Sequence, residues 1–244
     1  DATGTTVYLV GDSHADHLGE AIIAAAEATG HPVRIATANS CPFYDTYLKS
    51  TAQPNSRCRA FVQNTLSYLE NQPPGIVIIS SSSIYWNSRV FSAGATPDSL
   101  SRERAVKREA LEAGLESTVR RLEATGHQVL LVQDVPYFSK PATSDPQQFS
   151  ALRIAMGGDL SVTMPLAEAD ANQALQRKAF ADVAGRTNAT VIDLREFFCP
   201  NGTCTTQRNG AYLYRDEGHI SIAASRALAV IFSQSLATLP ASAQ

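Results

Sequence analysis

The sequence lacks the features that mark nucleic-acid-binding and membrane-embedded proteins. Its 244 residues carry 20 Lys and Arg against 23 Asp and Glu, so no excess of positive charge is present to attract nucleic acid. No apolar run approaches the ~20 residues that a membrane-spanning helix requires. The 5 histidines are scattered, and the 4 cysteines form no C-x-x-C pair of the kind that binds zinc. We predict no nucleic-acid partner, no metal site and no cofactor.

The few cysteines fall into two local pairs, Cys41 with Cys58 and Cys199 with Cys204. An Asn-Gly sequence between Cys199 and Cys204 is typical of a tight turn, which would bring these two sulfur atoms together. Two disulfides are therefore favoured over four free thiols. Disulfides imply an oxidising compartment, such as a periplasm.

The length and the apolar content are those of one domain with a sizeable core, since 44% of the residues are hydrophobic. The chain begins with Asp1 rather than with methionine, and its first predicted strand starts almost at once. We expect a single domain over residues 1–244 that has been excised from a larger protein.

The fold is organised around residues 7–14, which read VYLVGDSH. An apolar run that stops at Gly11 predicts a buried strand, and the helical spacing of apolar residues from Ala15 predicts a helix directly behind it. Ser13 then lies where a central strand turns into a helix, at the edge of the sheet where α/β proteins bind ligands. The alternative is that Gly11 makes a tight turn and Ser13 only caps the helix.

A second motif lies near the C-terminus, where Asp216 and His219 are three residues apart. This spacing allows both side chains to face one point from a loop that enters a helix. A carboxylate beside an imidazole fixes the tautomer of the ring and stabilises its charged form, as a serine nucleophile requires. Together the two motifs predict a catalytic triad of Ser13, His219 and Asp216.

The chain resembles the SGNH (GDSL-like) hydrolase family at residues 11–14 (GDSH), 40–42 (SCP) and 213–221 (LYRDEGHIS). It is most similar to the SGNH domains fused to acyltransferase-3 membrane proteins, which O-acetylate bacterial cell-surface glycans. The resemblance implies that Ser13 is the nucleophile and that Asp216 and His219 supply the acid and the base. It also implies a glycan acceptor, an acetyl donor delivered by a membrane acyltransferase domain, and a periplasmic location with a tether to the inner membrane.

The rest of the chain alternates between apolar runs and helical periodicities. This alternation implies a mostly parallel sheet with helices on both faces. We expect strands at residues 7–10, 31–37, 76–79, 128–133 and 189–193, and helices at 16–29, 59–71, 98–125, 167–185 and 219–235. Long loops are expected at 38–57 and 135–166. The predicted fold class is a three-layer α/β/α sandwich with a mostly parallel five-stranded sheet, for which the SGNH resemblance implies the flavodoxin-like strand order.

The resemblance also implies donors for the oxyanion that forms during acyl transfer. The backbone N–H of Ser13 is the first donor, and Ser40 occupies the position of the glycine that supplies the second. The third donor is normally the Asn of a G-x-N-D motif after the third strand, which is absent here. Asn87 is the nearby candidate, and the serines at 80–83 are the alternative.

Candidate glycan contacts follow the second and third strands. We expect Tyr44, Tyr85, Trp86 and Arg89 to bind the sugar, because exposed aromatic rings stack on sugar faces. The alternative is that Trp86 packs beneath a loop. The charged residues of the helix at 98–125 are expected to form a solvated face.

Other polar residues near Ser13 have predicted structural roles. Asp12 is expected to hydrogen-bond the turn beneath Ser13. His14 and His17 lie close to Ser13 on its own helix, but the sequence shows no carboxylate that would orient either ring. His219 is therefore the favoured base.

These assignments predict an O-acetyltransferase that works through an acetyl-serine intermediate on a bacterial glycan (O-antigen, another polysaccharide or peptidoglycan). A GDSL-type carbohydrate esterase is the alternative, because water and a sugar hydroxyl can resolve the same acyl-serine. A metallophosphoesterase is a further alternative, since residues 11–14 match its G-D-x-H opening, but its G-N-H-[DE] motif is missing. A non-catalytic glycan-binding module would leave Asp216 and His219 unexplained.

Overall fold

The computed structural model describes residues 4–50, 55–138 and 161–239. At its centre lies a five-stranded parallel sheet in the order β2-β1-β4-β6-β8. The strands are β1 (Val7–Gly11), β2 (Val33–Thr37), β4 (Ile76–Ser80), β6 (Gln128–Val132) and β8 (Thr190–Ile192). The predicted parallel sheet and its flavodoxin-like order are confirmed.

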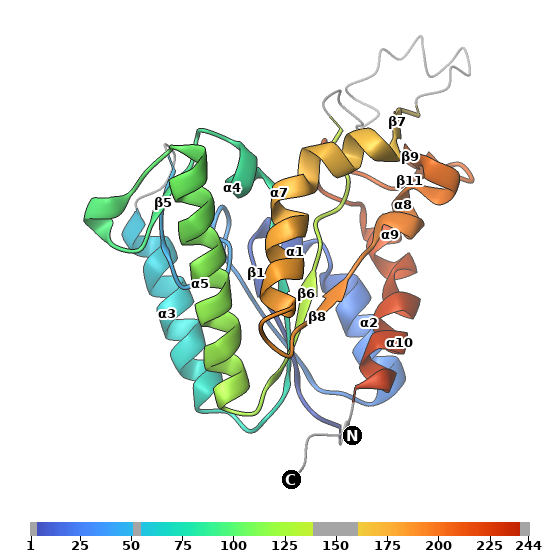
Figure 1. The fold of residues 1–244 in the computed structure, drawn as a ribbon. Coiled ribbons are helices and arrows are strands. Elements are labelled where there is room, and N and C mark those ends of the chain that lie inside the picture. The colour runs from blue at the N-terminus through green and yellow to red at the C-terminus, as the bar shows by residue number, and fades with distance from the viewer. Residues whose placement is uncertain (1–3, 51–54, 139–160, 240–244) are drawn as a thin grey trace.

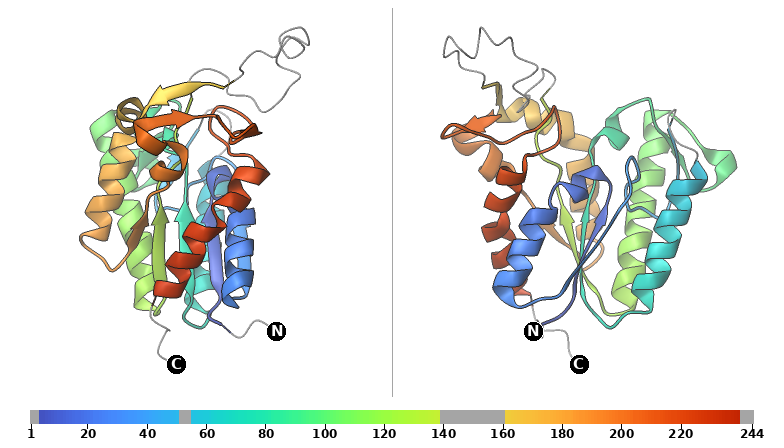
Figure 2. Two further views of the ribbon diagram at one scale, coloured as in Figure 1. Left: turned by 90° about the vertical axis from the view of Figure 1, so that its right-hand side faces the viewer. Right: turned by 180° about the vertical axis from the view of Figure 1, so that it is seen from behind.

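Helices cover both faces of this sheet (Figures 1 and 2). One layer contains α3 (Asn55–Glu70), α5 (Arg104–Ala124) and α7 (Leu166–Ala184). The other layer contains α2 (Gly19–Thr29), α9 (Ile222–Ala227) and α10 (Ala229–Thr238). The three-layer α/β/α sandwich is therefore confirmed. None of the described helices is both long enough and apolar enough to cross a membrane.

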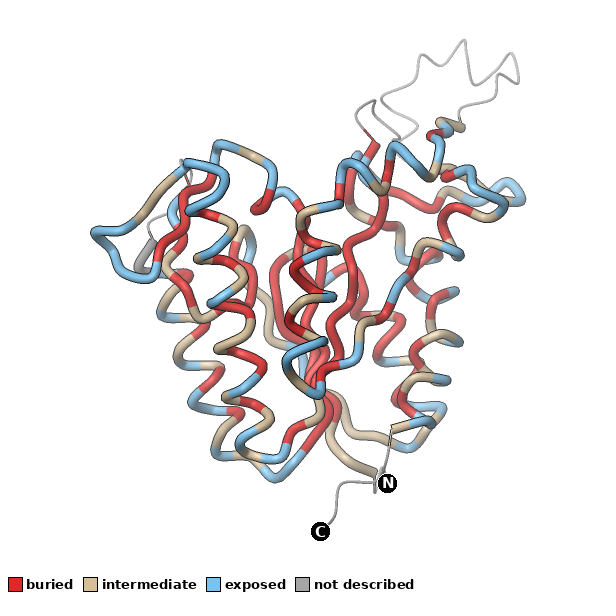
Figure 3. Tube along the Cα trace, in the orientation of Figure 1, coloured by how far each residue is buried: buried red, intermediate tan, exposed pale blue. Residues whose placement is uncertain are grey.

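The sheet separates two hydrophobic cores. β1 and β4 are buried along their whole length, as parallel strands covered on both faces must be. Because successive side chains point to opposite faces, Leu9 and Ile78 join the core against α2 and α10, whereas Val10 and Ile79 join the core against α3 and α5. Figure 3 shows the buried central strands and the exposed outer sides of the helices.

Two helices differ from their predicted bounds in ways that matter for the site. The helix expected at 16–29 is divided into α1 (Ser13–Asp16) and α2, and the final helix begins at Ile222 instead of 219. Its start is fixed by Ser221, whose hydroxyl accepts the backbone N–H of Ala224 at 3.1 Å. His219 consequently lies in the loop before the helix.

Segments expected as loops contain short elements. β3 (Tyr47–Lys49) pairs with β5 (Ser92–Gly94), and β7 (Thr163–Pro165) pairs with β9 (Thr203–Thr205). Most of the loop expected at 135–166 lies outside the described residues. The remaining short elements are α4 (Ile84–Asn87), α8 (Arg195–Phe198), β10 (Gln207–Arg208), β11 (Ala211–Tyr212) and 3-10 turns at Pro97–Ser99 and Pro200–Gly202. Pieces this short carry too little periodicity to be predicted.

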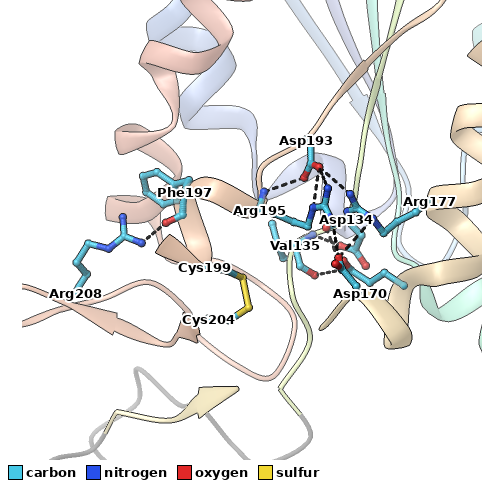
Figure 4. Close-up of a disulfide and its surroundings, with 11 residues drawn as sticks. Asp134, Val135, Asp170, Arg177, Asp193, Arg195, Phe197, Cys199, Cys204 and Arg208 are labelled. Atoms are coloured by element: carbon cyan, nitrogen blue, oxygen red, sulfur yellow. Dashed lines mark hydrogen bonds and ion pairs between the residues drawn. A yellow bond between two sulfur atoms is a disulfide. The ribbon is translucent and has the colours of Figure 1, made fainter. Parts of the chain in front are cut away.

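Both predicted disulfides, Cys41–Cys58 and Cys199–Cys204, are present. The first ties the loop after β2 to α3, and the second closes the turn between α8 and β9. Figure 4 shows the second disulfide beside α8, where ion pairs connect α7, α8 and the residue after β8 with one another. These pairs are Arg177–Asp193, Arg195–Asp193 and Arg195–Asp170.

Candidate functional site

Gly11 ends β1 and begins a sharp turn toward α1. Its φ of +149° lies in a region that favours glycine, and a Cβ at this position would lie 1.9 Å from the carbonyl oxygen of Ser80. Only glycine allows β1 to pass so close to β4 and then turn. The turn brings Asp12 and Ser13 to the carboxyl end of the central strand.

Asp12 holds the turn beneath Ser13, the structural role predicted for it. The residue is only 1% exposed. One carboxylate oxygen accepts the N–H of His14 at 2.8 Å. The other accepts the N–H of Ser82 at 3.1 Å and the hydroxyl hydrogen of Tyr85, with a distance of 2.6 Å between the oxygens. These bonds link α1 to the segment after β4, so the backbone around Ser13 is held from two sides.

Ser13, His219 and Asp216 form one chain of hydrogen bonds, although 206 positions separate the serine from the histidine. The hydroxyl of Ser13 donates to Nε2 of His219 at 2.8 Å. Nδ1 of His219 lies 2.8 and 3.0 Å from the two carboxylate oxygens of Asp216, so this nitrogen carries the proton of the neutral ring. Asp216 also accepts the backbone N–H of His219 at 2.7 Å, which fixes the carboxylate against the ring. The structure thus brings the predicted residues together.

The surroundings of Asp216 favour its charged form. Burial raises the pKa of this carboxyl group, but the N–H groups of Gly218 and His219 and the His219 ring outweigh burial and lower the pKa below its ordinary value. A carboxylate at this position stabilises an imidazolium on His219. The arrangement is chemically able to take a proton from the Ser13 hydroxyl and to return it to a leaving group.

A second imidazole–carboxylate pair lies beside this chain. Nδ1 of His14 donates to Asp134 at 2.6 Å, and both side chains are buried. Burial alone would lower the pKa of His14, but the charge of Asp134 and its hydrogen bond outweigh burial and raise the pKa to about 9. The expectation that no carboxylate orients His14 is wrong, because Asp134 follows β6 and the parallel sheet brings it to the same edge.

Three imidazole rings meet at this edge of the sheet. The ring centroid of His14 lies 4.7 Å from that of His219 and 5.0 Å from that of His17. Burial, together with the charge of His14, holds the pKa of His17 well below its ordinary value, so His17 is neutral. At neutral pH a positive charge on His14 therefore lies next to the Ser13–His219 pair.

A cavity of about 570 Å³ opens in front of Ser13. Its wall includes His219, Asp216, Ser40 and Asn87. The backbone N–H groups of Ser13 and Ser40 have no hydrogen-bond acceptor among the described residues, so an oxyanion in the cavity could use both. Ser40 has a φ of +55°, a left-handed conformation that favours glycine. The amide of Asn87 donates to the carbonyl of Asn172, which holds this side chain against α7.

The aromatic residues expected to stack on sugar are buried. Trp86 is 0% exposed, Tyr44 is 1% exposed, and Tyr85 contributes only to the cavity wall while its hydroxyl is bound to Asp12. Burial contradicts the expected stacking role for Tyr44 and Trp86 and favours the alternative that Trp86 is packed beneath other segments. Tyr85 keeps a place in the cavity wall. A different aromatic side chain in the cavity wall, Tyr137, is 45% exposed.

Arg89 lies outside the active-site cavity, in a neighbouring hollow between α4 and the start of α5. Lys107 of α5 lines the same hollow and is 1% exposed. Its amine donates to the carbonyl of Ser88 at 2.5 Å. The expectation that the charged residues of this helix form a solvated face is therefore wrong for Lys107.

The fold and the hydrogen-bonded chain at Ser13 can be compared with known proteins. A family model described as the SGNH domain (fused to AT3 domains) matches residues 1–234. The chain belongs to this SGNH family. A comparison with curated protein sequences finds no match.

Solved structures resemble this SGNH domain over nearly its whole length. The periplasmic domain of the Salmonella ser. Paratyphi A lipopolysaccharide acetyltransferase matches with a TM-score of 0.67 and 14% identity, over 98% of this chain and 85% of that chain. A carbohydrate esterase family 2 enzyme with a carbohydrate-binding domain, from Corynascus thermopiles (Myceliophthora fergusii), matches with a TM-score of 0.53 and 13% identity, over 97% and 67%. A putative acylhydrolase from Bacteroides fragilis matches with a TM-score of 0.51 and 13% identity, over 97% and 88%. At these identities the similarity shows the fold.

Proposed function

We propose that this SGNH domain is a serine-dependent O-acyltransferase that moves an acetyl group onto a hydroxyl of a bacterial cell-surface glycan. The observation that carries the proposal is the chain of hydrogen bonds from Ser13 through His219 to Asp216 in the wall of a cavity. The fusion of this family to AT3 domains and the fold shared with a lipopolysaccharide acetyltransferase support acyl transfer.

In the first half-reaction, Oγ of Ser13 attacks the carbonyl carbon of the acetyl donor while Nε2 of His219 accepts the hydroxyl proton. The N–H groups of Ser13 and Ser40 donate to the oxyanion of the tetrahedral intermediate. The bond between the acetyl carbon and the donor then breaks, and His219 gives its proton to the departing group. The product is an acetyl ester of Ser13.

In the second half-reaction, a sugar hydroxyl attacks the acetyl carbon and gives its proton to His219. The bond to Ser13 breaks, the O-acetylated sugar leaves, and the proton returns from His219 to Oγ of Ser13. The exposed ring of Tyr137 offers the sugar an aromatic surface in the cavity wall. The positive charge of His14 lies close enough to His219 to favour negative charge developing in the cavity.

The acetyl donor and the location of the reaction follow from the family and the cysteines. The AT3 fusion supports a membrane acyltransferase domain as the supplier of acetyl groups and as the tether to the inner membrane. The two disulfides support an oxidising compartment. We propose a periplasmic reaction.

A carbohydrate esterase is the second candidate, favoured by the fold shared with a family 2 carbohydrate esterase. Water would then replace the sugar hydroxyl in the second half-reaction. The two candidates share the acetyl-Ser13 intermediate, so they differ only in the acceptor that resolves it.

The test combines detection of the acyl-enzyme with analysis of the product. Intact-protein mass spectrometry after mixing with p-nitrophenyl acetate should find one acetyl group on the wild-type protein and none on Ser13→Ala. The two proteins should have the same circular dichroism spectrum, because Ser13 is only half-buried at a helix start. Retained turnover in Ser13→Ala would overturn the proposal.

The acceptor is identified in a second step. A panel of bacterial surface oligosaccharides should divert acetyl groups from water to sugar, which mass spectrometry detects as O-acetylated product. Rapid hydrolysis with no acetylated sugar from any acceptor would favour the esterase.

A further inference from the structure

We propose that the hollow beside the active-site cavity is a subsite for a carboxylate or phosphate group of the acceptor glycan. This anion subsite has a volume of about 490 Å³ and lies between α4 and the start of α5. Its charged wall consists of the cations Arg89, Arg102, Arg104 and Lys107 and the carboxylate of Glu103. The role of this subsite in binding an acceptor depends on the proposed transfer to a glycan. Its ability to bind an anion does not, and can be measured without catalysis.

The cations of the anion subsite lack carboxylate partners. None of the four forms an ion pair within the part of the chain that the structure describes. Other arginines do form such pairs, among them Arg59–Asp45, Arg121–Glu70, Arg186–Glu112, Arg195–Asp170 and Arg226–Glu20. Gathering like charges without counter-charges costs electrostatic free energy, which a bound anion would recover.

Glu103 does not neutralise the anion subsite. Its carboxylate is the N-cap of α5 and accepts the backbone N–H of Val106 at 2.9 Å. That hydrogen bond, with those of the neighbouring N–H groups, lowers the pKa of Glu103. Glu103 offsets only one of the four positive charges, so the hollow keeps an excess of positive charge, although the whole chain has a net charge of −3.

Lys107 is the buried member of the anion subsite. Its ammonium group donates to the carbonyl of Ser88, a neutral acceptor. Burial and the charge of Arg104 lower the pKa of this amine. An ammonium has three N–H donors, so donors remain for an anion that would also relieve the repulsion from Arg104. The guanidinium groups at the rim have the planar geometry that binds carboxylate or phosphate through paired hydrogen bonds.

Asn87 connects the anion subsite to the reaction. This residue lines both the hollow and the cavity in front of Ser13. An acceptor whose hydroxyl reaches Ser13 can therefore extend a charged group of the same or the next sugar into the hollow. On this proposal the acceptor is an anionic glycan. Its negative charge comes from a sugar acid or from a phosphate-substituted sugar.

Binding measured in the Ser13→Ala protein separates the subsite from catalysis. The probes are trigalacturonate, its full methyl ester as the uncharged control, and a trimer of glycerol phosphate. Isothermal titration calorimetry should find trigalacturonate or the phosphate trimer bound at least tenfold more tightly than the methyl ester. The tighter of the two identifies carboxylate or phosphate as the natural group. Raising NaCl from 20 to 500 mM should weaken this binding, because salt screens exposed charges.

Two variants locate the binding. Arg89→Gln/Arg102→Gln removes two exposed cations of the subsite and should weaken anion binding at least tenfold, with an unchanged circular dichroism spectrum. The matched control Arg226→Gln removes a charge on α9, on the opposite face of the sheet, and should bind as the parent does. Equal affinity for the charged and methylated probes, or unchanged anion binding in the double variant, would overturn the proposal. Because acetylation of Ser13 is measured separately, a failure of either proposal leaves the other open to its own test.

Discussion

Raising the pH from 7 to 10 should remove the positive charge of His14 and lower the free energy of unfolding. The pKa of His14 is about 9 in the folded protein and 6.5 in its ordinary state. A group whose pKa is raised by folding contributes stability that is complete below the unfolded pKa and is lost as the pH rises through the folded pKa. This difference in pKa corresponds to a stabilisation of the folded protein by about 3 kcal/mol at low pH. About 2.5 kcal/mol of this stabilisation is present at pH 7, and almost none is present at pH 10.

The groups that face His14 set the sign of this prediction. Burial opposes the charge on the ring, and Asp134, 2.6 Å away, provides the main compensation, with smaller contributions from Asp12 and Asp216. The ring centroids of His219 and His17 lie 4.7 and 5.0 Å from that of His14, and His17 is neutral. Since carboxylates surround His14, losing its proton leaves their buried negative charge without a counter-charge.

Urea unfolding at pH 7, 8.5 and 10 measures the effect by linear extrapolation. Between pH 7 and pH 10, the free energy of unfolding of the wild-type protein should fall by about 2.5 kcal/mol more than that of His14→Gln. His17→Gln is the matched control. Folding lowers the pKa of His17, so the contribution of this residue to stability is lost only as the pH falls below about 6.5. The dependence of the unfolding free energy on pH above pH 7 should therefore be the same in His17→Gln as in the wild type. Equal slopes for wild type and His14→Gln would refute this reasoning, as would an NMR titration of His14 with a pKa below 7.

Other substitutions test the geometry of the site. Asp216→Asn should lower the turnover of p-nitrophenyl acetate by about four orders of magnitude, because the amide no longer selects the required tautomer of the base; a loss below tenfold would contradict this role. Gly11→Ala should lower the free energy of unfolding in urea by more than about 2 kcal/mol, since its Cβ would collide with the carbonyl oxygen of Ser80. Equal stability would contradict the requirement for glycine at this turn. Tyr137→Ala should raise KM for an oligosaccharide acceptor severalfold and leave p-nitrophenyl acetate turnover within threefold; an unchanged KM would exclude the ring as a sugar contact. Removing both cysteines of the Cys41–Cys58 disulfide should lower the free energy of unfolding by about 3 kcal/mol, because the disulfide closes a loop of 17 residues in the unfolded chain. A loss below about 1 kcal/mol would contradict this stabilisation by loop closure.

The strands of the sheet, Ser13 and the Asp216/His219 pair were each predictable from the sequence because each depends on a strong local pattern. The meeting of Ser13 with His219 across 206 positions was expected from the family resemblance. The strand at 76–80 contains a continuous apolar run at 76–79, as expected for a strand that is covered on both faces. Ser13 comes two residues after the glycine that ends the strand, so its place at the carboxyl edge needs no knowledge of distant contacts. Asp216 and His219 are close in sequence, and their mutual orientation is a local property of the loop.

Contacts between distant segments were not predictable in the same way. Asp134 lies 120 positions from His14 and meets it only because β6 lies two strands from β1 in the sheet. Trp86 is buried because α7 and the loop at 41–46 pack against α4. The four residues 84–87 are too short to show a periodicity that would predict this packing. Lys107 occupies a helix position that is expected to be solvated because of its charge, but its amine donates to the carbonyl of Ser88 at the end of α4.

The serines after β4 explain how this edge of the sheet holds both imidazole pairs. β4 lies between β1 and β6, and the backbone N–H groups of Ser82 and Ser83 each bind a carboxylate that follows one of those neighbours. Ser82 donates to Asp12 at 3.1 Å, and Ser83 donates to Asp134 at 2.7 Å. Asp12 in turn fixes the turn of Ser13, and Asp134 fixes His14. These two N–H groups are already bound to carboxylates, so neither is the third oxyanion donor that the missing Asn left open. The mechanism proposed above therefore relies on the two remaining donors, the backbone N–H groups of Ser13 and Ser40.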